Sequence, residues 1–429
     1  MQVATPKKGY KMVKMSFGKY EEIPEEWEVE GINQISKIIT SGVKKYSGQK
    51  EFIQTGDIKH NRIVSSSKYS YEKRPSRANM EVKIDDVLFA KMKETDKVLL
   101  ISKKDSSFLF STGFAVLRSE KQKILPQFLR HYVNSTNFQK LKDKFSEGGT
   151  LVAINQKEFS RLQILLPSIL EQKQIASILS NADDTIQKTD QIIEQTQRLK
   201  KGMMQKLLTR GIGHTKFKKI KWYFGKQLEI PEEWEVRKLK EICKKITDGT
   251  HNPPKFTSDG IPFLFVSNIM HDKIDFNTKK YISEETFLKL FSRTPVERGD
   301  VLYSTVGSLG VAVLVETDKK FSFQRHIGYL KPNRNKIQSN FLVNILNSHL
   351  ISQQVQILAE GIAQKTLNLT PLKNFLIPLP SLPEQQQIVS ILSNIDTQIQ
   401  KEKIYKSNLE QLKKGLMQKL LTGQIRVKA

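Results

Sequence analysis

Hydrophobic positions follow two different periods along this chain. Short apolar runs such as 87–90, separated by Gly, Asn, Asp and Ser, recur through about 31–166 and 238–379. Apolar runs of this length, bounded by turn-forming residues, are typical of short buried strands. Segments 128–145 and 341–358 instead carry apolar residues at helical spacing. The pattern therefore predicts two globular parts of mixed α and β structure.

A long helix is predicted after each globular part, over about 171–209 and 384–422. Gly211 and Gly423 follow directly and suit a helix C-terminus. The predicted heptad positions are Ile175, Ile178, Ala182, Thr185, Thr189, Ile192, Thr196, Leu199 and Met203, then Ile388, Ile391, Ile395, Gln398, Glu402, Tyr405, Leu409, Leu412 and Leu416. They are apolar at both ends and more polar in the middle, which predicts two helices packed as an antiparallel coiled coil.

The two halves of the chain repeat each other. Three motifs recur in the same order: IPEEWEV at 23–29 and 230–236, LPSILEQKQIASILSNADDTIQK and LPSLPEQQQIVSILSNIDTQIQK from Leu166 and Leu379, and KKGMMQKLLT and KKGLMQKLLT from Lys200 and Lys413. Two copies of one unit on a single chain predict a pseudo-twofold internal repeat. The fold class expected is α+β, with domains at 1–166, 167–211, 212–379 and 380–429.

Charge is the strongest compositional signal. The 429 residues carry a formal net charge of +26, with 70 Lys and Arg against 44 Asp and Glu spread along the chain. This favours a polyanionic partner, and duplex DNA suits a pseudo-twofold protein. The alternative is a Lys-rich or thermophilic surface, although thermophilic surfaces usually gain Glu together with Lys.

Cysteine usage and hydropathy bear on the compartment. Cys243 is the single cysteine, which excludes an intramolecular disulfide and a multi-cysteine zinc site. No apolar run reaches about 18 residues, and the first residues form no apolar signal segment. We expect a cytoplasmic protein without a membrane span.

Candidate catalytic motifs are weak. Asn252–Pro253–Pro254 resembles part of the loop that holds the flipped base in amino-group DNA methyltransferases, but Lys255 stands where an aromatic residue should follow. No glycine-rich methyl-donor motif precedes it, and a rigid turn is the better interpretation.

Other catalytic patterns are weaker still. Asp57 with Glu81 and Lys83 could imitate a metal-dependent nuclease triad, but the second copy has Asn268 opposite Asp57 and no matching Glu-x-Lys. There is no P-loop motif, and the seven histidines follow no metal-ligand spacing.

The ordered double set of motifs resembles the specificity subunit of type I restriction–modification systems. Its carriers are IPEEWEV, the LPxxxEQxxI helix starts and KKGxMQKLLT, each present twice, with DGTHNPP at 248–254. The first copy has TSGV at 40–43 in place of DGTH, so a contact made by His251 has no counterpart there. The resemblance covers essentially the whole chain.

The resemblance implies a non-catalytic subunit that recognises a bipartite asymmetric site in double-stranded DNA. It implies assembly with two methylation subunits, and with restriction subunits for cleavage, and it leaves the methyl donor, ATP and magnesium to those partners. No cofactor is expected on this chain. Two alternatives stay open, a self-contained DNA methyltransferase or nuclease, and a pseudo-dimeric DNA-binding regulator or architectural protein.

Polar residues beside predicted strand ends and Gly-containing loops are the candidates for DNA contacts, because Arg, Lys, Asn and Gln can pair with base edges and Lys with phosphate. They are Lys91, Lys93, Lys103, Lys104 and Gln156 in the first half, and Thr250, His251, Asn252, Lys255, Ser304, Thr305, Ser308, Gln324, Arg325, His326, Gln364 and Lys365 in the second.

Exposed helix positions that are identical in both copies are the candidates for partner docking, since two copies of one partner need two equivalent surfaces. They are Gln172, Gln187, Lys188, Lys200, Lys201, Gln205 and Lys206, and Gln385, Gln400, Lys401, Lys413, Lys414, Gln418 and Lys419. A helix of about 39 residues is roughly 58 Å long, so the helices are also expected to set the gap between two half-sites.

Overall fold

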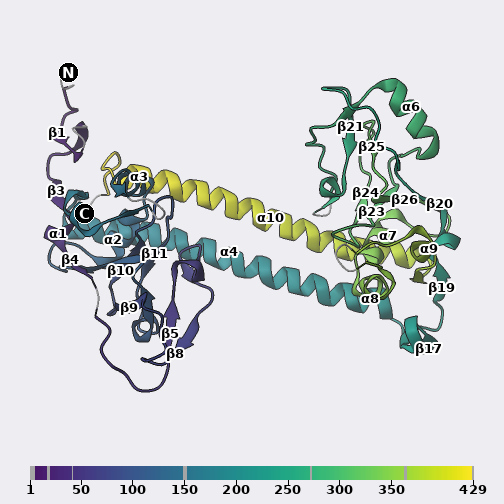
Figure 1. Ribbon diagram of the computed structural model, residues 1–429, viewed down its shortest axis with the longest axis horizontal. Helices are drawn as coiled ribbons and strands as arrows, with labels where there is room; N and C mark the ends of the chain where they lie inside the picture. Colours follow the sequence, from purple (N-terminus) through teal and green to yellow (C-terminus); the bar gives the residue numbers. More distant parts are fainter. Residues whose placement is uncertain are drawn as a thin grey trace. The chain divides into compact units, whose positions relative to one another are not determined.

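The computed structural model describes residues 5–16, 20–40, 42–147, 152–270, 273–361 and 365–427. The chain forms two compact units: unit 1 is Met1–Gln191 with Ile404–Ala429, and unit 2 is Ile192–Lys403. Each unit contains one globular part, the beginning of one long helix and the end of the other (Figure 1). Both helices are thus divided between the units, and the four-domain boundaries expected from the sequence stay a prediction.

Two four-stranded sheets form the centre of the globular part of unit 1. The first has the order β11 (Val98–Leu100), β10 (Val87–Ala90), β13 (Phe114–Ser119), β4 (Ser36–Ile39), and the second β8 (Ser67–Tyr69), β5 (Lys50–Ile53), β12 (Leu109–Ser111), β9 (Ala78–Glu81). The first sheet is antiparallel throughout, whereas β12 runs parallel to β5.

Shorter elements complete unit 1. They are the strand pairs β1 (Tyr10–Lys14) with β2 (Tyr20–Pro24), β3 (Glu28–Gly31) with β16 (Gln163–Leu166), β6 (Ile58–Lys59) with β7 (Arg62–Ile63) and β14 (Ser146–Glu147) with β15 (Ala153–Ile154), the helices α1 (Ile32–Ile35), α2 (Pro126–Val133) and α3 (Thr136–Lys144), and the 3-10 turns η2 (Thr55–Asp57), η3 (Asp105–Ser107) and η4 (Gln156–Arg161).

Unit 2 repeats this plan. Its larger sheets have the orders β20 (Cys243–Asp248), β26 (Ile327–Pro332), β23 (Val301–Ser304), β24 (Ala312–Leu314) and β22 (Tyr281–Ile282), β21 (Ile261–Leu264), β25 (Ser322–Phe323). The remaining elements are β17 (Phe217–Lys221) with β18 (Gln227–Pro231), β19 (Glu235–Lys238) with β27 (Leu376–Leu379), α5 (Leu239–Ile242), α6 (Glu284–Arg293), α7 (Ser339–Leu346), α8 (His349–Leu358), α9 (Leu369–Lys373), η5 (Tyr223–Gly225) and η6 (Val266–Ile269).

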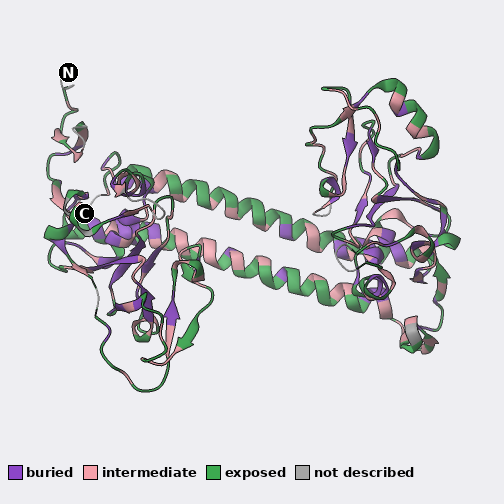
Figure 2. Ribbon diagram, viewed as in Figure 1, coloured by how far each residue is buried: buried purple, intermediate pink, exposed green. Residues whose placement is uncertain are grey.

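The central strand β10 is apolar at every position because both of its faces are covered. Val87 and Phe89 of β10 belong to the core around α2, while Leu88 and Ala90 belong to a second core shared with the other sheet. Successive side chains of a strand point to opposite faces, so two covered faces need a continuous apolar run. Figure 2 shows the central strands of the sheets as buried and much of the long helices as exposed.

The long helices are α4 (Ile169–Arg210) and α10 (Leu382–Leu420). As predicted, a glycine with positive φ lies just beyond each helix, Gly211 at 63° and Gly423 at 73°. A side chain at Gly423 would also meet Pro24, because its Cβ would lie 2.4 Å from Pro24 Cδ. Glycine is therefore required there both by backbone conformation and by space.

Six of the 18 predicted seam positions are wrong because they are exposed: Ile178, Ile192, Leu199, Gln398, Tyr405 and Leu412. Ile175 and Thr189 are buried as expected, but Ile178 and Ile192 are 36% and 41% exposed. The buried residue in the first case is Leu179, one position later. The sequence offers adjacent apolar residues at both places, so spacings of three and four fit equally well. Only the packing of the helices selects between them.

Ion pairs join the two helices in antiparallel order. In unit 1 the beginning of α4 meets the end of α10, and in unit 2 the end of α4 meets the beginning of α10. The pairs are Asp183 with Lys413 at 2.5 Å and Asp190 with Lys406 at 2.7 Å in unit 1, and Lys200 with Asp396 at 2.6 Å in unit 2. The antiparallel order agrees with the prediction, while supercoiling of the helices stays a prediction.

The described ranges contain neither a candidate membrane-spanning helix nor a candidate metal centre. None of the helices there combines the length and the apolar character that crossing a bilayer requires. The same residues contain no group of three or more His, Cys, Asp and Glu side chains arranged to hold a metal ion.

Candidate nucleic-acid interface

Four loops of unit 2 meet at one end of its sheets. Thr250 forms a parallel bridge with Gln324, and Arg325 N donates to Thr250 O at 2.9 Å. Thr305 N donates to His326 O at 3.0 Å, and Gly307 N donates to Lys365 O at 3.3 Å. The structure therefore brings together four sets of residues that the sequence could only nominate separately. We call them the unit 2 loop cluster: 250–255, 304–308, 324–326 and 365.

Gly249 allows two of these loops to touch. A Cβ on Gly249 would lie 2.2 Å from Phe323 O, so any side chain would force the loops apart. The neighbouring Asp248 is 8% exposed, and its two carboxylate oxygens lie 2.9 Å from His251 Nε2 and 2.9 Å from Arg293. This carboxylate orients His251, whose side chain is still 52% exposed. The DGTH motif is therefore a support that presents a polar side chain to solvent.

Two candidates in this cluster have structural roles instead. Ser304 is fully buried, and its hydroxyl donates to Ser308 O at 2.7 Å. Thr305 is 4% exposed, and its hydroxyl donates to His326 O at 2.9 Å. Neither hydroxyl can reach DNA, so the prediction of contacts at these two positions is wrong. Both residues lie at the end of a buried strand and satisfy neighbouring backbone groups. In the sequence, polar residues with this role look the same as residues that contact bases.

The other members remain able to contact a ligand. Thr250, Gln324 and His326 are half-buried, and the exposed members are His251, Asn252, Lys255, Ser308, Arg325 and Lys365. Burial and then the adjacent Arg325 lower the pKa of His326, which favours the neutral ring. Gln364 lies outside the described residues. The cluster thus combines amide, guanidinium, hydroxyl and imidazole groups, which suit hydrogen bonding to base edges.

Unit 1 builds the corresponding loop on the same backbone frame. Met92 bridges Ala153 there, as Val306 bridges Thr366 in unit 2. Lys91 N donates to Gly113 O at 2.9 Å, and Lys93 N donates to Val152 O at 2.9 Å. These bonds match those made by Thr305 and Gly307. The frame is common to the units, whereas the side chains that it carries differ.

Lys91 is the most distinctive side chain of this loop. It is half-buried, burial lowers the pKa of its amine, and no carboxylate pairs with it among the described residues. The loop is held from behind by Lys142, which is fully buried and donates to Met92 O at 2.8 Å and to Thr95 O at 2.9 Å. Lys93 is exposed. No sequence pattern singles out Lys142, because a lysine in a helix is normally solvated.

Lys103 and Lys104 do not join Lys91 and Lys93. In the β10–β11 register, Val87 lies opposite Leu100, so the turn after β11 is at the beginning of β10, whereas Lys91 follows its end. Lys103 and Lys104 thus lie at the other end of this strand pair from Lys91 and Lys93, and their contact with DNA stays a prediction. Gln156 begins η4, and its side chain lies outside the description.

Two pairs of the partner-docking candidates are not exposed. Gln172 and Gln385 are fully buried, and each caps a backbone turn in its own unit. Lys200 and Lys413 face the opposite helix in the ion pairs described above. Packing thus explains their identity between the copies, and the prediction is wrong for them. Gln187 is half-buried, and the exposed candidates are Lys188, Lys201, Gln205, Lys206, Gln400, Lys401, Lys414, Gln418 and Lys419.

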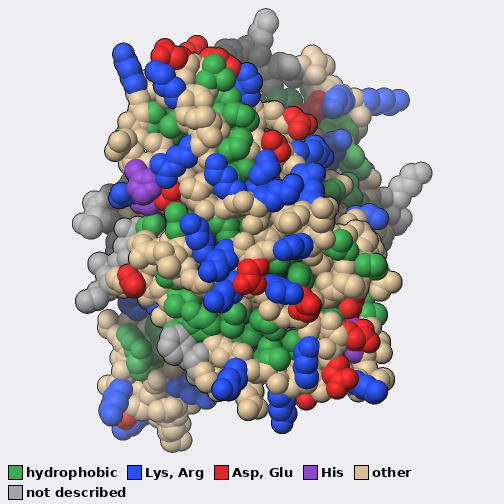
Figure 3. All heavy atoms as spheres, turned by 90° about the vertical axis from the view of Figure 1, so that its right-hand side faces the viewer, with side chains coloured by type: hydrophobic (Ala, Val, Ile, Leu, Met, Phe, Trp, Pro, Cys, Tyr) green, Lys and Arg blue, Asp and Glu red, His purple; other side chains and the backbone are tan. Residues whose placement is uncertain are grey.

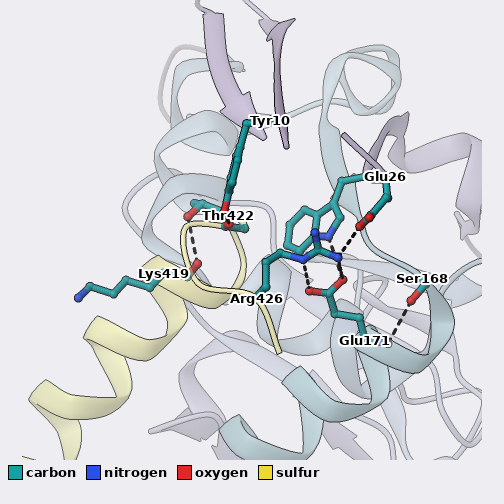
Figure 4. A network of polar contacts seen from close by, with 9 residues as sticks. Tyr10, Glu26, Ser168, Glu171, Lys419, Thr422 and Arg426 are labelled. Carbon is teal, nitrogen blue, oxygen red and sulfur yellow. Dashed lines mark hydrogen bonds and ion pairs between the residues drawn. The ribbon is translucent and has the colours of Figure 1, made fainter. Parts of the chain in front are cut away.

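The repeated motifs converge on one junction in each unit. In unit 1, Glu171 at the beginning of α4 accepts from Trp27 Nε1 at 3.0 Å and from Arg426 Nε at 2.8 Å (Figure 4). The bonds to Glu171 and then Glu26 raise the pKa of Arg426 above its usual range. Trp27 and Arg426 lie 144 and 255 positions from Glu171 in the chain, and no local pattern indicates that they meet.

The junction of unit 2 uses the same tryptophan and glutamate. Glu384 accepts from Trp234 Nε1 at 2.9 Å and lies 2.9 Å from His214 Nε2. The IPEEW motif, the helix start and the segment after the other helix therefore recur because together they fasten two helices to a globular part. The nuclease pattern also has a structural role, since Asp57 and its counterpart Asn268 both cap a 3-10 turn.

Basic side chains outnumber acidic ones in this chain. Lys and Arg side chains spread over the face drawn in Figure 3, with acidic side chains between them, as expected for a net charge of +26. A protein surface of this charge attracts polyanions.

Comparison with known proteins identifies the family. The model of the type I restriction modification DNA specificity domain matches residues 24–198 and again residues 231–411. The chain belongs to this family. The double match confirms both the internal repeat and the resemblance seen in the sequence. Membership makes the chain a non-catalytic DNA-recognition subunit of the type I restriction–modification class.

Similar proteins agree over the full length. The type I restriction enzyme MjaVIII specificity subunit of Methanocaldococcus jannaschii is 30% identical over 95% of this chain and 94% of its own length. The putative type I restriction enzyme MjaX specificity subunit of the same organism is 31% identical over 95% of each. A chain from a solved structure on complex assembly and conformational transition of the type I R-M system has a TM-score of 0.61 at 19% identity, covering 94% of this chain and 99% of that one. That likeness supports the α+β fold.

Proposed function

We propose that this DNA-specificity subunit recognises a bipartite, asymmetric site in double-stranded DNA, with one half-site for each unit. It carries no catalytic group of its own and assembles with two methylation subunits, and with restriction subunits when cleavage occurs. Methyl transfer and ATP-dependent steps belong to those partners.

One observation carries the proposal. The loop after β10 in unit 1 and the loop after β23 in unit 2 are held by the same backbone hydrogen bonds. Unit 1 nevertheless presents Lys91 and Lys93 where unit 2 has Thr305 and Gly307. Two domains that recognise different DNA sequences can share a backbone frame, but they need different side chains on it. A regulator that bound two identical half-sites would instead need the same side chains in both copies.

The helices α4 and α10 supply the proposed spacer. They contain 42 and 39 residues and are joined by ion pairs in each unit. A rigid helical pair of this kind has a length set by residue number, at about 1.5 Å per residue. The length of the pair would then fix the number of unread base pairs between the half-sites.

The decisive experiment is selection from randomised duplex DNA, with the chain alone and with the methylation subunit encoded beside it. A bipartite asymmetric motif with a fixed gap is the expected result. A motif that appears only with the partner adds that assembly completes the site. Salt-dependent binding without any motif would contradict the proposal and favour an architectural protein. Methylation of DNA by the purified chain alone would favour an enzyme.

A further inference from the structure

A short basic hairpin, which the sequence did not single out, stands on the globular part of unit 1. Its strands are β6 and β7, with Lys59 directly opposite Arg62. The turn residues His60 and Asn61 both have positive φ, 48° and 58°. Lys59, His60 and Arg62 are all exposed. We call residues 59–62 the hairpin tip.

The hairpin tip is held firmly by its one inward-facing side chain. Asn61 Nδ2 donates to Asn134 Oδ1 at 3.0 Å, and Asn61 Oδ1 accepts from Val98 N at 2.9 Å. These bonds fix the turn to the end of α2 and the beginning of β11. The left-handed conformation is unfavourable for non-glycine residues, and the anchor offsets part of that cost. The turn is therefore held in place by its contacts with two other elements.

Electrostatics at the hairpin tip is unfavourable in the isolated protein. Like charges directly opposite on paired strands repel, and no carboxylate pairs with Lys59 or Arg62 among the described residues. The three exposed side chains line a groove of about 1670 Å³ within unit 1. The lining of this groove also includes carboxylates such as Asp96 and Asp105, so it is the exposed tip itself, with two unpaired cations and an imidazole, that favours an anion.

The second copy repeats the motif at the same place. Residues 57–63 read DIKHNRI, and residues 268–274 read NIMHDKI, so His60 matches His271 and Arg62 matches Lys273. Val64 N donates to Asp57 O at 2.8 Å, and Asp275 N donates to Asn268 O at 2.7 Å, so the same bond closes both segments. His271 and Asp272 lie outside the described residues, while Lys273 is exposed.

We infer that Arg62 of this hairpin tip and its counterpart Lys273 each contact a phosphate of the DNA backbone. The inference rests on the proposed function. Two readers of different half-sites share only what is independent of sequence, which is the sugar–phosphate backbone. Exposed residues that are equivalent in both copies therefore fit phosphate contacts, whereas the differing loop residues fit base reading. The phosphate contacts would position each unit on the DNA, and the differing loop residues would determine which sequence is recognised.

The test compares DNA binding across a range of salt concentrations for four single variants. Arg62→Ala and Lys273→Ala remove the matched cations, Arg62→Lys keeps the charge, and Lys83→Ala removes an exposed cation at the turn before β10. Each protein is titrated with the selected duplex and with an unrelated duplex, in the presence of the methylation subunit. Thermal melting confirms that each variant is folded.

Arg62→Ala and Lys273→Ala should each weaken binding several-fold on both duplexes and lower the salt slope by about 1. The selected motif should stay unchanged, Arg62→Lys should restore most of the affinity, and Lys83→Ala should have no effect. An altered base preference in one half-site would overturn the inference in favour of base reading. An unchanged salt slope would overturn it outright.

Loss of partner assembly with unchanged DNA binding by the chain alone would also overturn it, because the tip would then contact protein. The proposed function fails separately, if the unmodified protein selects no bipartite motif. The salt slope is measured on any duplex, so the two failures are distinguishable.

Discussion

At the scale of single residues, Gln172 and Gln385 show how a buried amide can resemble a docking residue in sequence. Gln172 Oε1 accepts from Leu125 N at 2.9 Å, and its Nε2 donates to Lys123 O and Pro167 O, each at 2.9 Å. Gln385 makes the matching set of bonds in unit 2. The two copies need the same residue because the same turn must be satisfied beside each helix start.

Gln172→Ala should therefore destabilise unit 1 by about 2–4 kcal/mol, because it leaves backbone groups unpaired in a buried place. Gln385→Ala should have a similar effect on unit 2. Denaturant unfolding measures both, and Gln400→Ala, at an exposed position, is the matched control with a change near zero. Folded variants of unchanged stability that lose partner assembly would reinstate the docking role.

At the scale of elements, the helix pair can be shortened by equal lengths of both helices without a change of register. Asp183 faces Lys413 and Asp190 faces Lys406, so seven residues of α4 correspond to seven residues of α10. Removing residues 184–190 together with 406–412 takes one heptad from each helix. Asp183 and Lys413 remain at the new joint, and the seam keeps its phase.

This double deletion shortens the pair by about 10 Å, close to three base pairs of duplex DNA. The gap in the selected motif should shrink by about three base pairs, while both half-sites stay the same. Removing the heptad from α4 alone is the control, since it breaks the pairing and should abolish specific binding. An unchanged gap after the double deletion would refute the spacer role of the helices.

At the scale of the whole molecule, the exposed repeat positions form the same set in each unit. Unit 1 takes them from the beginning of α4 and the end of α10, and unit 2 from the end of α4 and the beginning of α10. Lys188 and Lys414 belong to unit 1, while Lys201 and Lys401 belong to unit 2. We propose that these two sets dock the two methylation subunits.

Charge reversal separates the two docking surfaces. Lys188→Glu with Lys414→Glu should leave one methylation subunit per chain, and adding Lys201→Glu with Lys401→Glu should leave none. Analytical ultracentrifugation measures the stoichiometry, and Lys73→Glu, at an exposed position in the globular part of unit 1, is the control. Two bound subunits after all four substitutions would contradict the proposal.

The sequence by itself determined the repeat, the mixed α and β class, the long helices and their glycine ends. These features are local or periodic, because a covered strand needs a continuous apolar run and a helix end needs a residue that accepts positive φ. The family resemblance had the same origin, since the motifs IPEEW, the helix starts and KKGxMQKLLT are short segments that recur in order. The comparisons confirmed the repeat, the fold class and the family resemblance, and the structure shows the long helices and the glycines beyond them.

The tertiary structure decided which residues meet. Ser304 and Thr305 are buried, and Lys103 lies at the other end of the strand pair from Lys91, because strand register and burial depend on partners far along the chain. For the same reason, the sequence could not decide whether Ile178 or Leu179 is the buried residue of the helix pair. The junction of Trp27, Glu171 and Arg426 is the clearest case that local sequence pattern cannot predict, because it joins three distant segments. Local pattern sets what each segment can form, and long-range packing sets which of its polar side chains are free to bind.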